Sequence, residues 1–452
     1  MEAADTMKID TSFLEFCDNE YPTLDDWVLN ESIPFSTGSP GIFNIAIKRL
    51  IGSLSPAVEL LGFGEALHGG EEILTLRNLL FQQLVNKHGY TAIAIESSFP
   101  RGHVVNEYVA GRGHDSYDAI RETGFSHGFG MLEANRELVE WMREYNTDPS
   151  HRVKLRFYGF DSPTEMTGAE SPRVFLQFVL DYLRSVDDGD AGGEERRGRI
   201  DRLLGKDSDW DNPAAMTDPS KSVGLSPAAV SLRIETEDLI SELEVRRPEL
   251  VAKSGEDCYR EVVHYATSAR QLLNYHAEYA RKSPVGKRII VCLGIRDAMM
   301  ADNLHYAVSC ERGRGKVFAF AHNSHLQRGK AEWQLGRNLL TWWPAGAHLD
   351  LLLGAGYAVI GSAVGVSETN GIGQPEDGTL EKRLTAVPGP VRMIPTYRGR
   401  GLPASEIAAL PVRPRKARNP TWFPLTPRSL GDFDWLVVLD STGYARGGPE
   451  LP

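Results

Sequence analysis

The chain has 452 residues, of which 41% are hydrophobic and 24% charged, enough to bury a large core. Its formal net charge is −12, and it lacks a basic stripe or tail, which argues against nucleic-acid and anionic-membrane partners. The length allows two or three structural units, or one enlarged α/β domain with an insertion. The basic cluster at 413–418 is flanked by prolines, and we interpret it as a solvated loop.

Cysteine usage and the N-terminus indicate the compartment. Cys17, Cys258, Cys292 and Cys310 are scattered without a CxxC pair, so no disulfide framework or cysteine zinc site is predicted. Cys292 lies in an apolar run and is interpreted as a small core residue. The acidic N-terminus lacks the apolar region of a secretory signal, and no apolar segment is long enough to span a bilayer. We therefore expect a cytoplasmic protein.

Short runs rich in apolar, β-branched or aromatic residues predict strands at 57–63, 90–96, 153–160, 316–321, 357–365 and 433–440. Helix-like sequence follows each run. Near-continuous apolar strands that alternate with helices are typical of a mostly parallel sheet covered by helices. After the first strand, residues 71–87 have apolar residues at helical spacing and an acidic first turn that suits the helix dipole. The predicted fold class is α/β.

Between about residues 170 and 311 the strand signal fades, and four segments with helical periodicity take its place. The glycine-rich, charged span 187–199 predicts a mobile loop or a linker at a helix end. We therefore expect an α/β core in two halves, residues 1–165 and 312–452. A helical insertion, residues 166–311, separates them and forms a lid or cleft wall.

Titratable residues gather at the predicted carboxyl ends of four strands. They are Glu65 and His68 after the first strand, Glu96 at the end of the second, Asp161 at the end of the third, and His322 and His325 after the fourth. Ligands of open parallel sheets bind in the crevice beyond these strand ends. The sequence therefore predicts a functional site there.

His68 lies beside two glycines, where the backbone can approach a substrate closely, and it is the favoured general base. Glu96 interrupts an apolar run and would be partly buried unless it is paired. Arg77 could pair with Glu96 or Glu72 as a structural bridge, or it could hold a substrate oxygen.

Three further side chains have ordinary structural explanations. Glu71 is interpreted as a helix cap or a solvated residue. His325 is equally compatible with a core histidine. For Asp161, orienting a partner or capping the following turn is favoured over direct chemistry.

Several catalytic classes lack their motif, because the chain has no GxSxG, GxGxxG, P-loop or HExxH pattern. Two chemistries remain open. A histidine oriented by carboxylates could activate water directly, with Arg77 or a second histidine stabilising the oxyanion. Alternatively, nitrogen and oxygen ligands could bind a metal through His68, Glu72, Glu96, His322 and His325.

The run "GEALHGGEEILTLRNLLFQQLVNKHGYTAIAIE" resembles the GE-x-x-H…E-x(4)-R…E pattern of the erythromycin esterases. The similarity continues in "HGFGMLEANRELVEWMREYN", "FYGFDSP", "IRDAMMADNL", "FAHNSHL", "WPAGAHLDLLLGAGYAVIG" and "DGTLEKRL". These motifs cover most of the chain from about residue 23 to 440, apart from the helical insertion. The chain departs from its relatives in the length and sequence of that insertion.

The resemblance implies a metal-independent hydrolase, without a cofactor, that opens the lactone ring of a macrolide antibiotic and so confers resistance. His68 would act as general base on a water, and Glu65 and Glu72 would position the histidine or the water. Glu96 matches another motif position, and His322 would contact the oxyanion or the leaving group. The substrate-binding residues would be Arg77, His325, Asp297 and Asp161.

Two other functions stay open at this point. The same site could serve a tailoring enzyme of natural-product biosynthesis, catalysing dehydration, cyclisation or transacylation once water is excluded. The fold could also persist in a binding protein without chemistry, but the presence of the acids and bases of the motifs argues against this. The expected partner is a small molecule, with neither nucleic acid nor membrane involved, and the sequence does not fix the oligomeric state.

Overall fold

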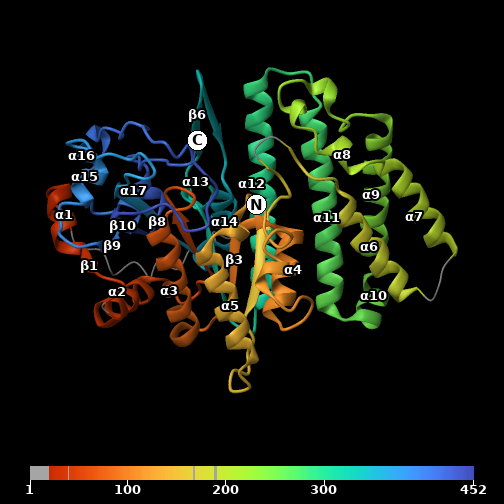
Figure 1. Cartoon of the computed structure of the whole chain (residues 1–452), viewed down its shortest axis with the longest axis horizontal. Helices are drawn as coiled ribbons and strands as arrows, with labels where there is room; N and C mark the ends of the chain where they lie inside the picture. The colour runs from red at the N-terminus through yellow and green to blue at the C-terminus, as the bar shows by residue number, and fades with distance from the viewer. Residues whose placement is uncertain (1–19, 39, 166–167, 188–190, 452) are drawn as a thin grey trace, which may run out of the picture.

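The computed structural model describes residues 20–38, 40–165, 168–187 and 191–451 (Figure 1). Its centre is an eight-stranded sheet with the strand order β1-β9-β10-β8-β2-β5-β3-β4. The strands of this sheet are β1 (Ile33–Phe35), β2 (Leu60–Glu65), β3 (Tyr90–Ser98), β4 (Arg156–Asp161), β5 (Lys316–His322), β8 (Tyr357–Val366), β9 (Val391–Pro395) and β10 (Trp435–Ser441). The six predicted strands are all present, which confirms the α/β prediction.

The pairing is mostly parallel, as predicted. The pairs along the run β10-β8-β2-β5-β3-β4 are all parallel, whereas β9 runs antiparallel to both β10 and β1. The sequence did not reveal β1 and β9, because β1 has three residues and β9 has an arginine as the second of its five. It also missed a separate hairpin of β6 (Ala331–Leu335) and β7 (Asn338–Trp342), most of whose residues are exposed or only partly buried.

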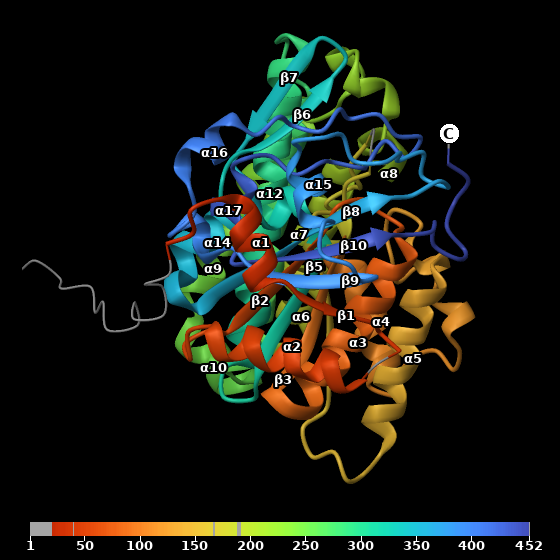
Figure 2. The same cartoon turned by 90° about the vertical axis from the view of Figure 1, so that its left-hand side faces the viewer.

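Helices cover both faces of the sheet, and each face has its own apolar core (Figure 2). On one face pack α2 (Pro40–Ser53), α3 (Glu71–His88), α4 (Phe99–Val109) and α5 (Glu133–Thr147). On the other face pack α1 (Leu24–Glu31), α12 (Val285–Glu311), α13 (Asn323–Leu326), α14 (Ala345–Leu353), α15 (Leu380–Leu384) and α17 (Ser429–Asp432), with α16 (Ala404–Ala409) beside them. The predicted helix at 71–87 is α3.

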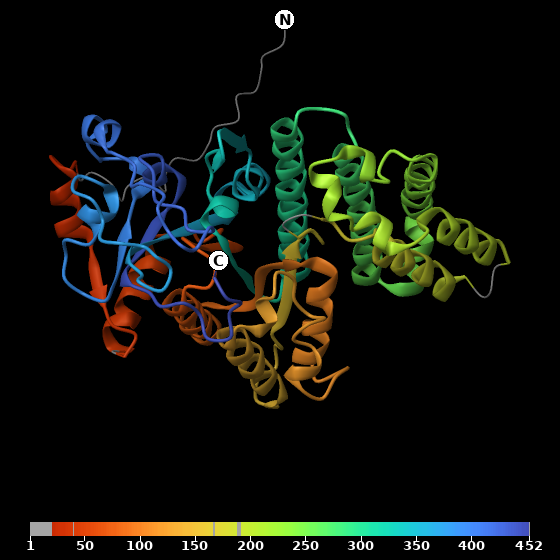
Figure 3. The same cartoon turned by 45° about the horizontal axis from the view of Figure 1, so that its top comes forward.

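The helical region forms a bundle beside the sheet, with a third apolar core of its own (Figure 3). Its helices are α6 (Arg173–Val186), α7 (Ala191–Leu204), α8 (Asp207–Trp210), α9 (Pro227–Val245), α10 (Arg247–Ser254) and α11 (Glu256–Tyr279). Cys292 is buried in this third core, as predicted. The predicted loop at 187–199 is wrong from residue 191 onward, where α7 begins, because arginines of α7 pair with acidic residues of α6 and α9. Residues 188–190, and Cys17 near the N-terminus, lie outside the described part of the chain.

Helix α12 connects the two parts of the molecule, since it contributes side chains both to the bundle core and to the sheet core. It runs from the outer end of the hairpin region down to β5, and it brings Arg296 and Asp297 to the carboxyl ends of the strands. Across the described residues, no helix is both long enough and apolar enough to cross a membrane.

Candidate active site

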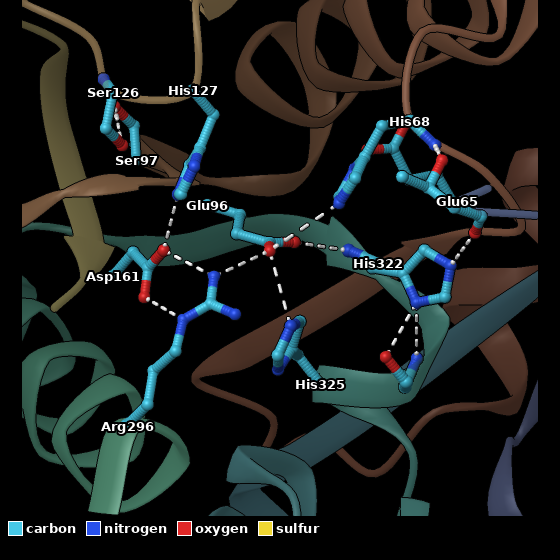
Figure 4. A network of polar contacts seen from close by, with 12 residues as sticks. Glu65, His68, Glu96, Ser97, Ser126, His127, Asp161, Arg296, His322 and His325 are labelled. Carbon is cyan, nitrogen blue, oxygen red and sulfur yellow. Dashed lines mark hydrogen bonds and ion pairs between the residues drawn. The ribbon is translucent and has the colours of Figure 1, made fainter. Parts of the chain in front are cut away.

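The site lies at the carboxyl ends of four neighbouring strands, in the order β2, β5, β3 and β4 (Figure 4). Glu65 ends β2 and lies opposite His322, which ends β5. Glu96 lies near the end of β3, next to Asp161 at the end of β4. Parallel pairing therefore brings together the side chains that the sequence placed at the strand ends, as predicted.

His68 follows β2 in a turn, and its ring is held from one side. Its Nδ1–H donates to Glu65 Oε1 at 2.6 Å, which leaves Nε2 as the nitrogen that can accept a proton. Nε2 lies 3.8 Å from Glu96 Oε1. Burial lowers the pKa of His68, but the negative charges of Glu96 and Glu65 outweigh burial and raise it above its usual value. The side chain remains 25% exposed, so solvent and substrate can reach it.

Glu96 is buried at the centre of the site and contacts several donors. Its Oε2 accepts the backbone N–H of His322 at 2.8 Å, and its Oε1 lies 3.3 Å from His325 Nε2 and 3.2 Å from Arg296 Nη2. Burial opposes ionisation, yet the charges of His325 and His68 hold the pKa of Glu96 well below its usual range. Glu96 is therefore a fixed anion facing His68.

His325 is a buried cation. Its Nδ1–H donates to Asp297 Oδ1 at 2.8 Å, and its Nε2 faces Glu96. Burial lowers the pKa of His325, but Asp297 and Glu96 raise it to about 10. Asp297 in turn accepts Trp342 Nε1–H at 2.7 Å and the backbone N–H of Ala345 at 2.9 Å. The hairpin and the start of α14 therefore cover this part of the site. Asp297 holds His325, and His325 in turn contacts Glu96.

His322 is buried and neutral. Its Nε2–H donates to the carbonyl oxygen of Thr421 at 2.9 Å, and its Nδ1 accepts the backbone N–H of Ser324 at 3.1 Å. Burial lowers its pKa to about 3. Because both ring nitrogens have protein partners, the contact to an oxyanion or leaving group that the sequence predicted would require His322 to give up one of them. Its ring packs beside His68, with centroids 5.3 Å apart.

A strap of irregular chain, residues 419–423, holds both histidines. Thr421 Oγ1 accepts the backbone N–H of His68 at 2.9 Å, and Asn419 Nδ2 donates to the His68 carbonyl at 3.0 Å. Phe423 packs edge-on against His322. The preceding basic cluster is not simply solvated, because Arg413 is buried and donates to the carbonyls of Val364 and Gly365. The prolines and the absence of periodicity concealed this strap in the sequence.

Arg77 is 1% exposed and joins α3 to α5 beneath Glu65. It donates to Asn78 and Asn135, and its guanidinium lies 4.9 Å from the centroid of the Phe320 ring. These contacts replace the predicted bridge to Glu96 or Glu72. Arg77 lines a small pocket together with Glu65 and Glu96. Burial lowers the pKa of Arg77 to about 10, so it remains a cation beside the Glu65 carboxylate.

Glu72 lies apart from the proton-carrying groups, contrary to the role predicted for it. Its Oε2 accepts Thr442 Oγ1–H at 2.8 Å and the backbone N–H of Gly443 at 2.7 Å. The neighbouring Glu71 binds Arg446 through the side chain and the backbone. Both acids fasten the segment after β10 to the first turn of α3, so they have a structural function there.

Two positively charged residues near Asp161 were not predicted. Arg296 donates to both Asp161 oxygens, at 2.8 and 2.6 Å, and His127 Nε2–H donates to Asp161 Oδ2 at 2.9 Å. Burial opposes ionisation of Asp161, but Arg296 and His127 lower its pKa to about 2. Asp161 thus orients partners, as the sequence favoured. Arg296 was missed because Asp297, next to it, matched the motif more visibly.

The donor set does not have the arrangement of a metal centre. Within the described residues, no group of three or more His, Cys, Asp or Glu side chains has the geometry to hold a metal ion. Both nitrogens of His322 and of His325 are directed to protein partners, and Glu72 points to Thr442.

Comparison with known proteins identifies the family to which the chain belongs. The family model described as erythromycin esterase matches residues 85–442, most of the chain. The chain belongs to the erythromycin esterase family. The family places it among the carboxylic-ester hydrolases, which confirms the enzyme class that the sequence predicted.

The sequence identities to individual relatives and to solved structures are low. The chain is 26% identical over 350 residues to erythromycin esterase type II of Escherichia coli, covering 75% of this chain and 76% of that protein. A Bacillus cereus protein shares the fold with a TM-score of 0.71 at 17% identity, covering 94% of this chain and 98% of its own. A mutant of the erythromycin esterase EreC in its open conformation has a TM-score of 0.63 at 18% identity, and the match covers 90% of this chain and 95% of the EreC chain. The last two likenesses show the fold.

Proposed function

We propose that this family member hydrolyses the lactone ester of a macrolide-like small molecule, and that His68 activates the attacking water without a metal. The membership in an esterase family supports the reaction class. The relative from Escherichia coli, an erythromycin esterase by name, supports the substrate class. The chemical assignment rests on the side chains at the strand ends.

The observation that carries the proposal is the environment of His68. Its Nδ1–H is bound to Glu65, so Nε2 has the lone pair, and the ring is more exposed than His322 or His325. A histidine fixed in one tautomer by a carboxylate is suited to remove a proton from water. A water bound at Nε2 would also lie near Glu96, 3.8 Å from that nitrogen, which would orient it.

The steps follow from this arrangement. His68 Nε2 takes a proton from water while the oxygen of that water attacks the ester carbonyl carbon. The new imidazolium is stabilised by Glu65 at 2.6 Å and Glu96 at 3.8 Å. When the tetrahedral intermediate collapses, the ring C–O bond breaks, and His68 returns the proton to the departing alkoxide. The product is the ring-opened hydroxy acid.

The reaction steps also require Glu96 to remain ionised, and Arg296 and His325 provide the positive charge that stabilises it. They hold Glu96 ionised at a fixed distance, so the carboxylate does not take the proton of His68. These contacts support proton transfer by the partly exposed His68 and charge balance by the buried groups.

The engagement of His322 and His325 also supports a metal-independent reaction, since neither ring presents a free lone pair. Beside the strand ends, the helical bundle would provide a wall for a large ring. The alternative tailoring functions use the same residues, and the product identifies them.

The test is mass spectrometry of purified protein incubated with a panel of macrolides, with His68→Asn in parallel and with EDTA in a third sample. We expect a mass gain of one water, about 18 Da, in the first and third samples and a loss of at least about 100-fold in the variant. Loss of the product with EDTA, restored by zinc, would contradict the metal-independent mechanism. No mass change with any macrolide would contradict the substrate class.

A further inference from the structure

The turn at residues 125–129 presents His127 to the site from the side opposite His322 (Figure 4). The segment begins the sequence motif at 127–146, in which no residue had a role. His127 has a φ of 56°, in the left-handed region that residues other than glycine seldom adopt. Such conformations persist where surrounding contacts hold them, and they are concentrated at functional sites.

The contacts that hold this turn are extensive. Ser126 Oγ accepts the backbone N–H of Ser98, and Ser97 Oγ accepts the backbone N–H of Ser126, each at 2.9 Å. The turn is therefore fastened to the end of β3, directly after Glu96. This attachment fixes the position of the His127 backbone relative to the site.

His127 is bound between two carboxylates. Nε2–H donates to Asp161 at 2.9 Å, and Nδ1 lies 2.8 Å from Glu165 Oε2. Burial lowers the pKa of the ring, but the hydrogen bonds to Asp161 and Glu165 raise it to about 9, so both nitrogens carry protons at neutral pH. The charge of Arg296, on α12, opposes that of the ring, and Phe129 packs against both His127 and His68.

The two carboxylates differ in their freedom to move. Asp161 is fully buried and fixed by Arg296, whereas the Glu165 side chain is 45% exposed. Nδ1–H can therefore exchange Glu165 for another acceptor while Nε2–H stays on Asp161. The His127 side chain is 18% exposed, which admits such an acceptor.

Phe129 relates this ring to the proposed base. Its ring lies 5.4 Å from His68 and 5.5 Å from His127, centroid to centroid, so one side chain packs against both imidazoles. A group bound beside Phe129 would therefore face both His68, the proposed base, and His127, whose charged ring can donate a hydrogen bond.

We propose that His127 is a second catalytic residue of the proposed ester hydrolysis, whose Nδ1–H leaves Glu165 and binds the substrate carbonyl oxygen as it becomes an oxyanion. No proton is transferred by His127 in this step: the proton of water goes to His68, and the negative charge on the oxygen is balanced by the imidazolium. Glu165 occupies the position of that oxygen until substrate binds. The inference rests on the proposed function of His68.

The first experiment compares His127→Asn and Glu165→Gln with wild type in erythromycin ring opening, with His103→Gln and Glu170→Gln as matched controls. Asparagine tolerates the left-handed conformation, so the turn is retained without the cation. His103 is an exposed histidine of α4, and Glu170 is a partly exposed acid that pairs with Arg101. Thermal unfolding of each variant verifies that it is folded.

We expect kcat to fall about 100- to 1,000-fold in His127→Asn, the usual loss when one oxyanion donor is removed. The controls should stay within twofold. The wild-type rate should decline above pH about 9, as His127 loses its proton, and Glu165→Gln should move that decline to lower pH because it removes a group that raises the pKa. The proposal would be overturned if the kcat of folded His127→Asn were within threefold of wild type. It would also be overturned if the rate of Glu165→Gln declined at the same alkaline pH as that of wild type.

A binding experiment separates this proposal from the proposed function. Phenyl methylphosphonate is a stable tetrahedral anion that resembles the intermediate, and its binding is measured by calorimetry without turnover. We expect at least tenfold weaker binding to His127→Asn than to wild type and to His68→Asn. Equal binding to wild type and His127→Asn, or no binding to wild type, would overturn the role of His127 even if erythromycin is opened. Weaker binding without ring opening of any macrolide would support His127 as the oxyanion donor while contradicting the proposed substrate.

Discussion

His68 and His325 are a closely matched pair in this molecule, and the difference between them separates chemistry from support. Each ring places Nδ1 on a carboxylate, Glu65 or Asp297, and each directs Nε2 toward Glu96. Yet the His68 side chain is 25% exposed, and that of His325 is 6% exposed. Trp342 and the start of α14 cover the second pair and leave the first open.

The same contacts therefore have different consequences. His325 lies 3.3 Å from Glu96 and is a cation at neutral pH, whereas His68 lies 3.8 Å from Glu96 and can exchange a proton with a substrate or water. A histidine–carboxylate pair in a protein is thus not a catalytic dyad by contact alone. Access to the second nitrogen is what distinguishes the two.

The largest effect expected from breaking this comparison is on His68. Replacing it by Asn keeps a polar side chain in the turn but removes the base, so kcat should fall by about 100- to 10,000-fold. Thermal unfolding should change little, because the side chain is partly exposed. Steady-state kinetics on a macrolide that wild type opens, with unfolding curves, measures both. Activity retained within tenfold would contradict the role of His68.

The matching change, His325→Gln, should act first on stability. It leaves the buried Asp297 carboxylate without its His325 cation and leaves Glu96 with Arg296 alone, which costs about 3–5 kcal/mol in the free energy of unfolding. Because the folded-state pKa of His325 is raised to about 10, its contribution is complete below pH about 6.5 and is lost as pH rises toward 10. Denaturant unfolding at pH 6 and pH 10 tests this. An equal loss at both pH values would contradict a charge effect.

A substitution in the strap should have a smaller effect, and it should act on His68 without acting on His325. Thr421→Val removes the hydroxyl that accepts the His68 backbone N–H but retains the carbonyl that binds His322. We expect a loss of about 0.5–1.5 kcal/mol in stability. A several-fold fall in kcat should accompany it, because the turn that carries His68 is less well fixed. If the stability of Thr421→Val fell but its kcat did not change, the strap would not position His68 as described.

The smallest effect is expected for Glu72→Gln. Its hydrogen bonds to Thr442 and Gly443 weaken when the charge is removed, so unfolding should shift by about 1 kcal/mol or less while kcat stays unchanged. The melting temperature and kcat are the measurements. A hundredfold fall in kcat in a folded variant would restore the catalytic role first predicted for Glu72.

Sequence patterns predicted the parts of the fold and site that depend on neighbouring residues, and they missed contacts between residues far apart in the chain. Glu65, Glu96, Asp161 and His322 were predicted together because each ends an apolar run, and parallel strands align their carboxyl ends. The helical insertion and α3 followed from periodicity.

The remaining parts of the site left no comparable signal in the sequence. Arg296 lies within a long helix, and Thr421 lies in a proline-rich segment without periodicity. Glu72, in the first turn of α3, could not be told from an active-site acid, because its partners lie some 370 residues later in the chain. Contacts made by tertiary packing were therefore the part that sequence patterns could not supply.

The most direct test of the central claim is the pH dependence of kcat/KM for wild type and Glu65→Gln. Because Glu65 and Glu96 raise the pKa of His68, the wild-type rate should rise with pH through a value above 6.5, as the base loses its proton. Removing the charge of Glu65 should move that rise to lower pH and reduce the plateau. A wild-type profile without this rise, or a rise that stays in place in Glu65→Gln, would contradict His68 as the base held by Glu65.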